Sequence, residues 1–403
     1  MNQSGTPGGA SHRGFSFGDG EQGGGRGCGY DGVMSETLRV GVVGCGRMGR
    51  FHARVYSQIA AASGERSGGG PGGRLGGAVE FAGVFDADVD HANAVAEEFG
   101  GRAFGSLGEM LEVVDAVTVA VPTKYHLAVA RECFAAKDGR GVHVLIEKPL
   151  AGTVAECREI AGLAARAGGG KGVTVQVGHV ERFNPAVRAM SRLGVTPRFI
   201  EVTRVSPLTF RSIDVGVVLD MMIHDIDIVL LLAGGLPVTS VEAVGVSVIG
   251  DVEDVCNARV KFGETGVGGG AMGGGCVANL TASRLAMKTE RKLRVFSPDA
   301  YVSLDYQKKY GIVARRGENL GAIREAVTKI RSGEIEDLSQ LNYTDLVQVE
   351  ELKIDDIEPL RAQLESFLEA VRTGGRPVVS AEDGTAAVEL AARIVDAIGG
   401  ASL

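Results

Sequence analysis

The sequence predicts an α/β fold: a doubly wound parallel sheet followed by an α+β part with a mostly antiparallel, open sheet. Two patterns carry this prediction. Up to about residue 178, short apolar and β-branched runs alternate with segments of helical spacing, which is typical of βαβ units. Beyond that point, strand-like runs follow one another with few helices between them, which favours antiparallel pairing.

The N-terminal part begins with the run LRVGVVG at 38–44, which has the pattern of a buried strand, and continues with helical spacing over 47–62. Strands that alternate with helices pair in parallel, with helices on both faces of the sheet. The same patterns predict further strands at 80–85, 117–121, 142–146 and 173–177 and helices at 88–99, 125–136 and 154–167.

The C-terminal part opens with a predicted helix at 219–232 and closes with two more, 357–372 and 381–398. Ser380 and Asp383 approximate a capping box at the start of the last helix. Strands are expected between these helices, at 241–248, 256–262, 277–284, 292–296, 301–306, 310–314 and 346–352.

Composition excludes several classes of protein. The 403 residues include 44% hydrophobic residues, enough for a packed core in two or three domains. A net charge of −8 argues against nucleic acid or an anionic membrane as a partner, since both require clustered Lys and Arg. The most apolar stretch, 215–233, is interrupted by charged residues, so no membrane span is predicted. No basic region followed by an apolar core precedes the first strand, and we therefore expect a cytoplasmic protein.

The 61 glycines gather in patches that mark the domain organisation. Residues 1–35 show no periodicity and are expected to form a disordered glycine-rich tail, with Met34 as an alternative translation start directly before the first strand. The 15 residues 63–77 are expected to be a glycine-rich loop insertion. We therefore predict a nucleotide-binding domain over 36–178 and a substrate and oligomerisation domain over 179–403.

Gly44, Gly46 and Gly49 form a GxGxxG turn between the first strand and the first helix. The first glycine permits a tight turn, the second lets the backbone approach a pyrophosphate, and the third allows the helix to pack on the strand. The amide end of the helix then favours the anion. This predicts a dinucleotide site in a Rossmann domain, the alternative being a tight strand–helix turn without a ligand.

Asp86 follows the second strand, 37 residues after Gly49. Without the segment 63–77 the separation is 22 residues, close to the spacing of about 20 at which an acidic residue binds a dinucleotide ribose. A carboxylate there accepts hydrogen bonds from the ribose diol and repels a 2′-phosphate, so NAD is favoured over NADP. The alternative for Asp86 is a solvated strand end or a helix cap.

Two further segments carry residue types suited to proton transfer. Lys148 ends a buried strand at the ligand edge of the sheet. At helical spacing, Asp220, His224 and Asp227 share one face of the 219–232 helix, whereas Asp225 points elsewhere. A carboxylate one turn from an imidazole can orient it as a general base, although a buried polar pair that stabilises the helix is the alternative. An Asp and a His without further clustered ligands do not predict a metal site.

Four motifs in this order, GVVGCGRMG, AVPTKYH, EKPL and DMMIHDID, resemble the Gfo/Idh/MocA family of sugar and inositol dehydrogenases. The resemblance extends from Leu38 to the C-terminal VVSAEDGTAAVELA. It implies a Rossmann domain joined to a domain whose open sheet mediates homodimers or homotetramers. By motif match it implies Lys148, Asp220 and His224 as the catalytic residues. It also implies further cofactor contacts, namely Arg47, Met48, Pro122, Thr123, His126 and Glu147.

The expected reaction is reversible hydride transfer between a sugar carbinol and nicotinamide. His224 would take the hydroxyl proton, Asp220 would hold its tautomer, and Lys148 would stabilise the developing alkoxide. The sequence leaves open whether Lys148 or His224 is the formal base.

The segment GHVERFNPA at 178–186 is similar to the branch of this family that oxidises C3 of UDP-N-acetylglucosamine. On that resemblance we expect Arg182 and Asn184 to contact sugar or cofactor. Arg204 and Arg211 are candidates for a diphosphate, the alternative for each arginine being an ordinary surface ion pair. Two other functions stay open: a dehydrogenase of free sugars or inositol, and a non-catalytic NAD-binding sensor.

Overall fold

The computed structural model describes residues 37–64, 77–170, 172–209, 214–263, 275–316, 320–333 and 347–400. The predicted tail at 1–35, most of the predicted insertion at 63–77, and Arg211 lie outside the described residues.

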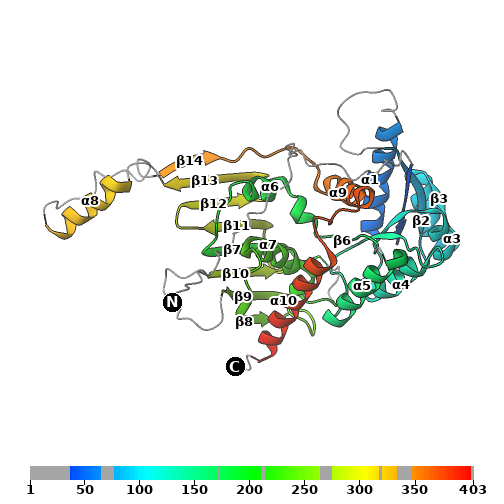
Figure 1. Ribbon diagram of the computed structural model, residues 1–403. Helices are drawn as coiled ribbons and strands as arrows, with labels where there is room; N and C mark the ends of the chain where they lie inside the picture. The colour runs from blue at the N-terminus through cyan, green and yellow to red at the C-terminus, as the bar shows by residue number, and fades with distance from the viewer. Residues whose placement is uncertain are drawn as a thin grey trace, which may run out of the picture.

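The N-terminal part is a parallel sheet of six strands within the described residues, in the order β3-β2-β1-β4-β5-β6 (Figure 1). This confirms the predicted doubly wound sheet. The strands are β1 (Leu38–Val43), β2 (Val79–Phe85), β3 (Arg102–Ala103), β4 (Ala116–Val119), β5 (His143–Ile146) and β6 (Val175–Val177). The helices are α1 (Arg47–Gly64), α2 (Val89–Phe99), α3 (Leu107–Val113), α4 (His126–Ala135) and α5 (Val154–Arg166), with short turns η1 (Thr123–Tyr125) and η2 (Gly168–Gly170).

The C-terminal part is built on a second sheet, of eight described strands in the order β14-β13-β12-β11-β7-β10-β9-β8. Only β7 and β10 pair in parallel among them, which confirms a mostly antiparallel sheet. The strands are β7 (Phe199–Val205), β8 (Val238–Val246), β9 (Val255–Phe262), β10 (Cys276–Ser283), β11 (Glu290–Phe296), β12 (Ala300–Asp305), β13 (Tyr310–Arg316) and β14 (Val347–Glu351). Helical segments are η3 (Val180–Phe183), α6 (Pro185–Ser191), η4 (Val218–Met222), α7 (Ile223–Ala233), α8 (Leu320–Arg331), α9 (Pro359–Thr373) and α10 (Ala381–Gly400).

Local sequence signals explain where helices next to the site begin. Thr153 and Glu156 form a capping box at the start of α5. Asn184 caps α6, with Pro185 in its first turn. At α10 the Ser380 amide donates to the Asp383 carboxylate at 2.8 Å, and the Asp383 amide donates to the Ser380 hydroxyl at 3.3 Å, as predicted.

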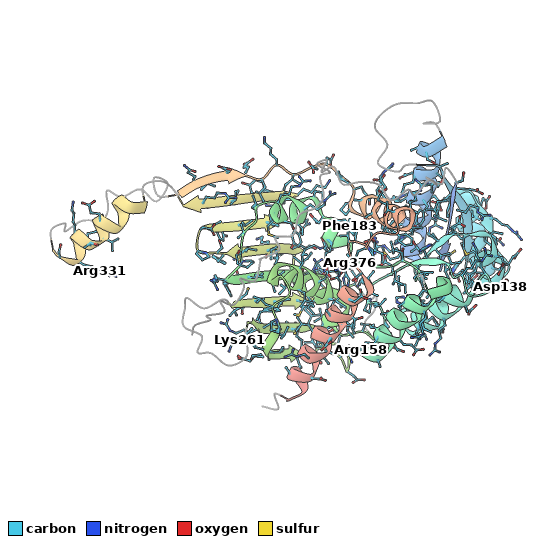
Figure 2. All side chains as sticks on the ribbon, viewed as in Figure 1. Asp138, Arg158, Phe183, Lys261, Arg331 and Arg376 are labelled. Atoms are coloured by element: carbon cyan, nitrogen blue, oxygen red, sulfur yellow. The ribbon has the colours of Figure 1, made fainter. Side chains whose placement is uncertain are left out.

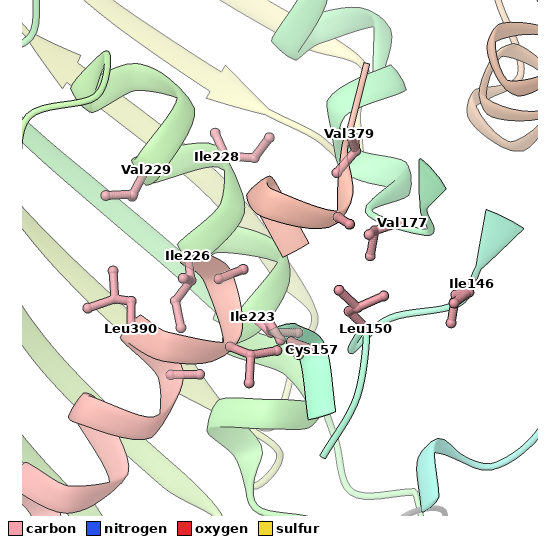
Figure 3. Close-up of a cluster of buried hydrophobic side chains, with 14 of the residues drawn as sticks. Ile146, Leu150, Cys157, Val177, Ile223, Ile226, Ile228, Val229, Val379 and Leu390 are labelled. Atoms are coloured by element: carbon pink, nitrogen blue, oxygen red, sulfur yellow. The ribbon is translucent and has the colours of Figure 1, made fainter. Parts of the chain in front are cut away.

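An apolar cluster between the two sheets holds α7 against the carboxyl ends of β5 and β6 (Figure 3). It combines Ile223 and Ile226 of α7 with Leu150 after β5, Val177 of β6 and Leu390 of α10. These side chains are at most 2% exposed, and each contributes about 1.5–3 kcal/mol by burial. The cluster therefore fixes the position of the helix that carries His224 relative to the loop that carries Lys148.

Helix α9 belongs to the C-terminal part of the sequence but packs in the core of the N-terminal sheet. Its Leu364 and Phe367 are fully buried in one apolar cluster with Val42 of β1 and Tyr56 of α1. Figure 1 shows α9 beside α1. The domain boundary at residue 178 remains a prediction, because packing crosses it.

The molecule is elongated: Arg331 on α8 and Asp138 after α4 lie at its opposite ends (Figure 2). In the described part of the chain, no helix has both the length and the apolar character needed to cross a membrane.

Candidate active site

The three motif glycines have three different environments at the carboxyl end of β1. Gly44 has a φ of +96°, and a Cβ there would lie 2.8 Å from the carbonyl oxygen of Ala120. A Cβ on Gly49 would overlap the carbonyl oxygen of Gly44, so the close approach of α1 to the turn requires glycine. Gly46 is different, because a Cβ there meets no atom within 4 Å. The open space beside Gly46, at the amide end of α1, fits an anionic group such as a pyrophosphate.

Asp86 reaches this turn from the carboxyl end of β2. Its Oδ2 accepts a hydrogen bond from the Cys45 amide at 2.5 Å, and its Oδ1 accepts one from the Asp88 amide at 2.9 Å. The cap of α2 is Asp88 rather than Asp86. Burial and the Asp86 charge raise the pKa of the Cys45 thiol to about 12, so this thiol stays protonated. Together with the space at Gly46, the Asp86 carboxylate fits the ribose end of NAD.

Four other predicted cofactor contacts lie along the same edge. Arg47 and Met48 are exposed in the first turn of α1, where the Arg47 guanidinium lies 5.5 Å from the centre of the Phe51 ring. Pro122 is exposed and directly precedes η1, and Thr123 is half-buried at the start of η1. Their contacts with a cofactor remain predictions.

His126, another expected cofactor contact, is buried and held by backbone carbonyls. It is 1% exposed, with Nδ1 lying 3.0 Å from the carbonyl oxygen of Pro149 and Nε2 lying 2.9 Å from that of Val121. Burial lowers the pKa of His126. Both ring nitrogens contact backbone carbonyls, so His126 joins the loops after β4 and β5, and its expected cofactor contact remains a prediction.

Glu147 likewise faces the protein interior. Its Oε1 accepts a hydrogen bond from His52 Nε2 at 2.8 Å, and its Oε2 accepts one from the Lys148 amide at 3.3 Å. Burial opposes the charge on Glu147, but His52 and Lys148 outweigh it and hold the carboxyl pKa below its ordinary value. Glu147 therefore ties the end of β5 to α1, and its expected cofactor contact remains a prediction.

Lys148 and Asp220 meet across the two parts of the molecule. Lys148 Nζ donates to the carbonyl oxygen of Asp220 at 2.6 Å and lies 3.4 Å from its Oδ1. The two side chains are 20% and 33% exposed. Lys148 is thereby held after the carboxyl end of β5 with its side chain partly exposed.

Asp220 does not orient His224 as expected. In the described residues no hydrogen bond joins the two side chains. The reason is local: Asp220 lies in the π-helical turn η4, where the spacing of 100° per residue does not apply. The role expected for Asp220 is corrected from holding the imidazole to holding Lys148.

His224 is half-buried in the first turn of α7, and its Nδ1 is buried without a hydrogen-bond partner among the described residues. Burial, followed by the positive charges of Lys148 and Arg204, holds the pKa of His224 well below its ordinary value. The imidazole is therefore neutral near pH 7, the state that a general base requires.

Arg182 and Arg204 are buried ion-pair partners of α7. Arg182 donates from Nε and Nη2 to the two carboxylate oxygens of Asp227, both at 2.8 Å. Arg204 donates to Asp225 at 2.8 and 2.9 Å and to Glu181 Oε1 at 3.1 Å. Burial opposes the charge on Arg204, but both carboxylates outweigh it and raise its pKa.

The Arg182 and Arg204 side chains are 8% and 5% exposed and already paired, which leaves them little surface for a ligand, and the expected substrate contacts remain predictions. Asn184 is also engaged within the protein: its amide donates to Glu181 Oε2 at 3.0 Å, and its oxygen accepts from the Ala186 amide. Its contact with sugar or cofactor remains a prediction. Arg211 lies outside the described residues and remains a prediction.

Two residues near the site were missed by sequence reasoning. His179 lies two residues after the end of β6. It is 0% exposed, and neither of its ring nitrogens has a partner among the described residues. Arg291 lies at the start of β11, in phase with the buried Leu293 and Val295. A signal existed for Arg291, since an arginine in the apolar phase of a strand is unusual.

Comparisons with known proteins agree with this architecture. Residues 38–179 match the model of an oxidoreductase family with an NAD-binding Rossmann fold, and residues 203–302 match the Gfo/Idh/MocA C-terminal domain. Over 281 residues the chain is 36% identical to UDP-N-acetylglucosamine 3-dehydrogenase of Acidithiobacillus ferrooxidans, covering 70% of this chain and 78% of the relative. Over 215 residues it is 34% identical to inositol 2-dehydrogenase 2 of Saccharopolyspora erythraea, covering 51% and 56%.

Solved structures give the same result. The A. ferrooxidans UDP-N-acetylglucosamine 3-dehydrogenase has a TM-score of 0.72 at 30% identity, covering 91% of this chain and 98% of that one. Levoglucosan dehydrogenase in complex with NADH and levoglucosan has a TM-score of 0.69 at 18% identity, over 91% and 98%, and this shows the fold alone. The chain therefore belongs to the Gfo/Idh/MocA family of oxidoreductases, and its N-terminal part is an NAD-binding Rossmann domain.

Proposed function

We propose that this protein is a nucleotide-sugar dehydrogenase that oxidises C3 of a UDP-N-acetylhexosamine, such as UDP-N-acetylglucosamine, to a ketone with NAD. The observation that carries the substrate is the 36% identity over 281 residues to UDP-N-acetylglucosamine 3-dehydrogenase. The observation that supports catalysis is the meeting of Lys148 with the η4–α7 segment that carries His224.

In this proposal the motif glycines and Asp86 hold the cofactor. The space at Gly46 would take the pyrophosphate, and the Asp86 carboxylate would accept hydrogen bonds from the adenosine ribose. NAD, when bound, takes up the hydride of the carbinol carbon.

Residues of the protein accept the hydroxyl proton and stabilise the charge on the carbinol oxygen. His224 is neutral, because burial and nearby cations lower its pKa, and it takes the hydroxyl proton. Lys148 is held by the Asp220 carbonyl and carboxylate, and its ammonium group stabilises the negative charge that develops on the carbinol oxygen. The Arg182–Asp227 and Arg204–Asp225 ion pairs hold α7, the helix that carries His224, in place.

The test follows NADH fluorescence with UDP-N-acetylglucosamine, free N-acetylglucosamine and myo-inositol as substrates, with mass spectrometry of the product. The expected result is a product two mass units lighter than UDP-N-acetylglucosamine, with no turnover of the other two. Lys148→Met and His224→Gln are expected to lose at least about a thousandfold in kcat while binding NAD normally. Lys261→Met, which removes an exposed lysine paired with Glu242, is the matched control.

Turnover of myo-inositol in preference to the nucleotide sugar would replace the proposed substrate with a free polyol. Wild-type protein that binds NAD but reduces none of it in a single turnover with any of these sugars would favour the non-catalytic sensor. Assembly as a homodimer or homotetramer belongs to the same proposal, and native mass spectrometry of the purified protein tests it.

A further inference from the structure

Arg291 stands on the core-facing side of β11, at the end of the strand nearest α7. Residues 291, 293 and 295 share this side, and Leu293 and Val295 are buried while Arg291 is exposed. The strand register places Arg291 directly opposite Arg204 of β7, which lies beside β11 (Figure 1). Two arginines opposite each other on one side of a sheet repel, so this pairing weakens the sheet unless something compensates it.

The two arginines differ in how they are compensated. Arg204 binds Asp225 and Glu181 through four hydrogen bonds of 2.8–3.1 Å. The guanidinium of Arg291 has no hydrogen bond and no ion pair in the part of the chain that the structure describes. Partial burial and the Arg204 charge lower the pKa of Arg291, which means that the guanidinium stands in an unfavourable environment for its charge.

A short chain of contacts connects Arg291 to the reacting groups. Arg204, its cross-strand neighbour, holds Asp225, and His224 is the residue before Asp225 in α7. The Arg291 charge is one of those that lower the pKa of His224, together with Lys148 and Arg204. Arg291 therefore lies at the same end of the sheet as the proposed base, with its donors unoccupied.

We propose that Arg291 binds the diphosphate of the substrate while the sugar lies at Lys148 and His224. This inference rests on the proposed function, and it names the residue that distinguishes a nucleotide sugar from a neutral polyol. A guanidinium presents a planar fork of N–H donors that suits phosphate oxygens, and the contact requires no rearrangement of the Arg204 cluster. The competing explanation concerns charge balance. Arg204 supplies one positive charge for the two carboxylates of Glu181 and Asp225, and Arg291 would only supply the second, without contacting them.

The test compares Arg291→Gln with Lys292→Gln in protein saturated with NAD. The two variants lose the same charge at neighbouring positions, but Lys292 points to the opposite side of the sheet, where it lies 3.8 Å from Glu290. The probes are UDP in calorimetric titrations and UDP-N-acetylglucosamine in steady-state kinetics. For Arg291→Gln we expect UDP affinity to fall at least about tenfold and KM to rise by a similar factor, a larger change than that in kcat. Lys292→Gln is expected to match the wild type in both.

Equal UDP affinity in Arg291→Gln and Lys292→Gln overturns the inference and leaves charge balance as the role of Arg291. Absence of UDP binding by the wild-type NAD complex overturns it as well. Should Arg291→Gln fail to fold, Arg291→Lys keeps the charge and loses the fork, and an unchanged UDP affinity there counts against the contact. Tight UDP binding that depends on Arg291 without oxidation of UDP-N-acetylglucosamine would refute the proposed function and uphold the inference.

Discussion

Gly46→Ala separates the role of the glycine turn in folding from its role in cofactor binding. A Cβ at Gly46 meets no protein atom within 4 Å, so the added methyl group occupies only the open space proposed for the pyrophosphate. The free energy of unfolding without NAD should change by less than about 1 kcal/mol, because the loss of backbone freedom in the unfolded chain and the poorer helix cap act in opposite directions. The substitution should change the affinity for NAD more than it changes the free energy of unfolding. A hydrogen bond from a backbone amide to a charged group contributes about 1.5–3 kcal/mol, so displacing the pyrophosphate predicts a loss in NAD affinity of about 10- to 100-fold.

The assay is NAD titration by calorimetry together with thermal unfolding of the protein without NAD. Gly49→Ala is the matched control, because its Cβ would overlap the Gly44 carbonyl and it should therefore destabilise the protein without NAD. If Gly46→Ala binds NAD as tightly as the wild type, the pyrophosphate does not lie at this turn and the reasoning from the open space is refuted.

Three further predictions concern α7 and its surroundings. Because the pKa of His224 is lowered, the base stays deprotonated as pH falls through 6.5, so kcat/KM should remain level there and decline only at lower pH; a decline centred at or above 6.5 would contradict this. Arg204→Met should lower the free energy of unfolding by about 3–5 kcal/mol, measured by denaturant titration, because Asp225 and Glu181 are left buried without a counter-charge. His179→Phe should not destabilise the protein, since it removes two buried nitrogens that have no partner among the described residues, and a large drop in melting temperature would contradict this.

The sequence predicted most of the fold because the hydrophobic pattern is strong in segments that are buried on both faces. The parallel strands read as apolar runs, and the turn from Gly44 to Gly49 was found where the structure has it. β7 was missed, although it lies at the centre of the second sheet. Its core-facing residues are Ile200, Val202 and Arg204. Because one of these buried residues is charged, the alternation of apolar and polar residues that marks a strand is hidden.

The site was predicted less completely than the fold, for a similar reason. Arg182 and Arg204 have the chemistry of anion binding, and only the folded structure shows that carboxylates of α7 already occupy them. Asp220 and His224 have α-helical spacing in the sequence, whereas the π-helical turn η4 directs Asp220 to Lys148 instead. The arginine pairs depend on contacts between distant segments, and no pattern in the sequence marks the π-helical turn.

The packing of α9 against α1 has a consequence for synthesis of the protein. The chain leaves the ribosome from its N-terminus, so the first sheet emerges long before residues 359–373, which cover one side of its core. Until then, the apolar surface around Tyr56 has no partner. A fragment that stops after β6 should therefore expose this surface and aggregate, and the nucleotide-binding half should reach its final stability only when translation is nearly finished.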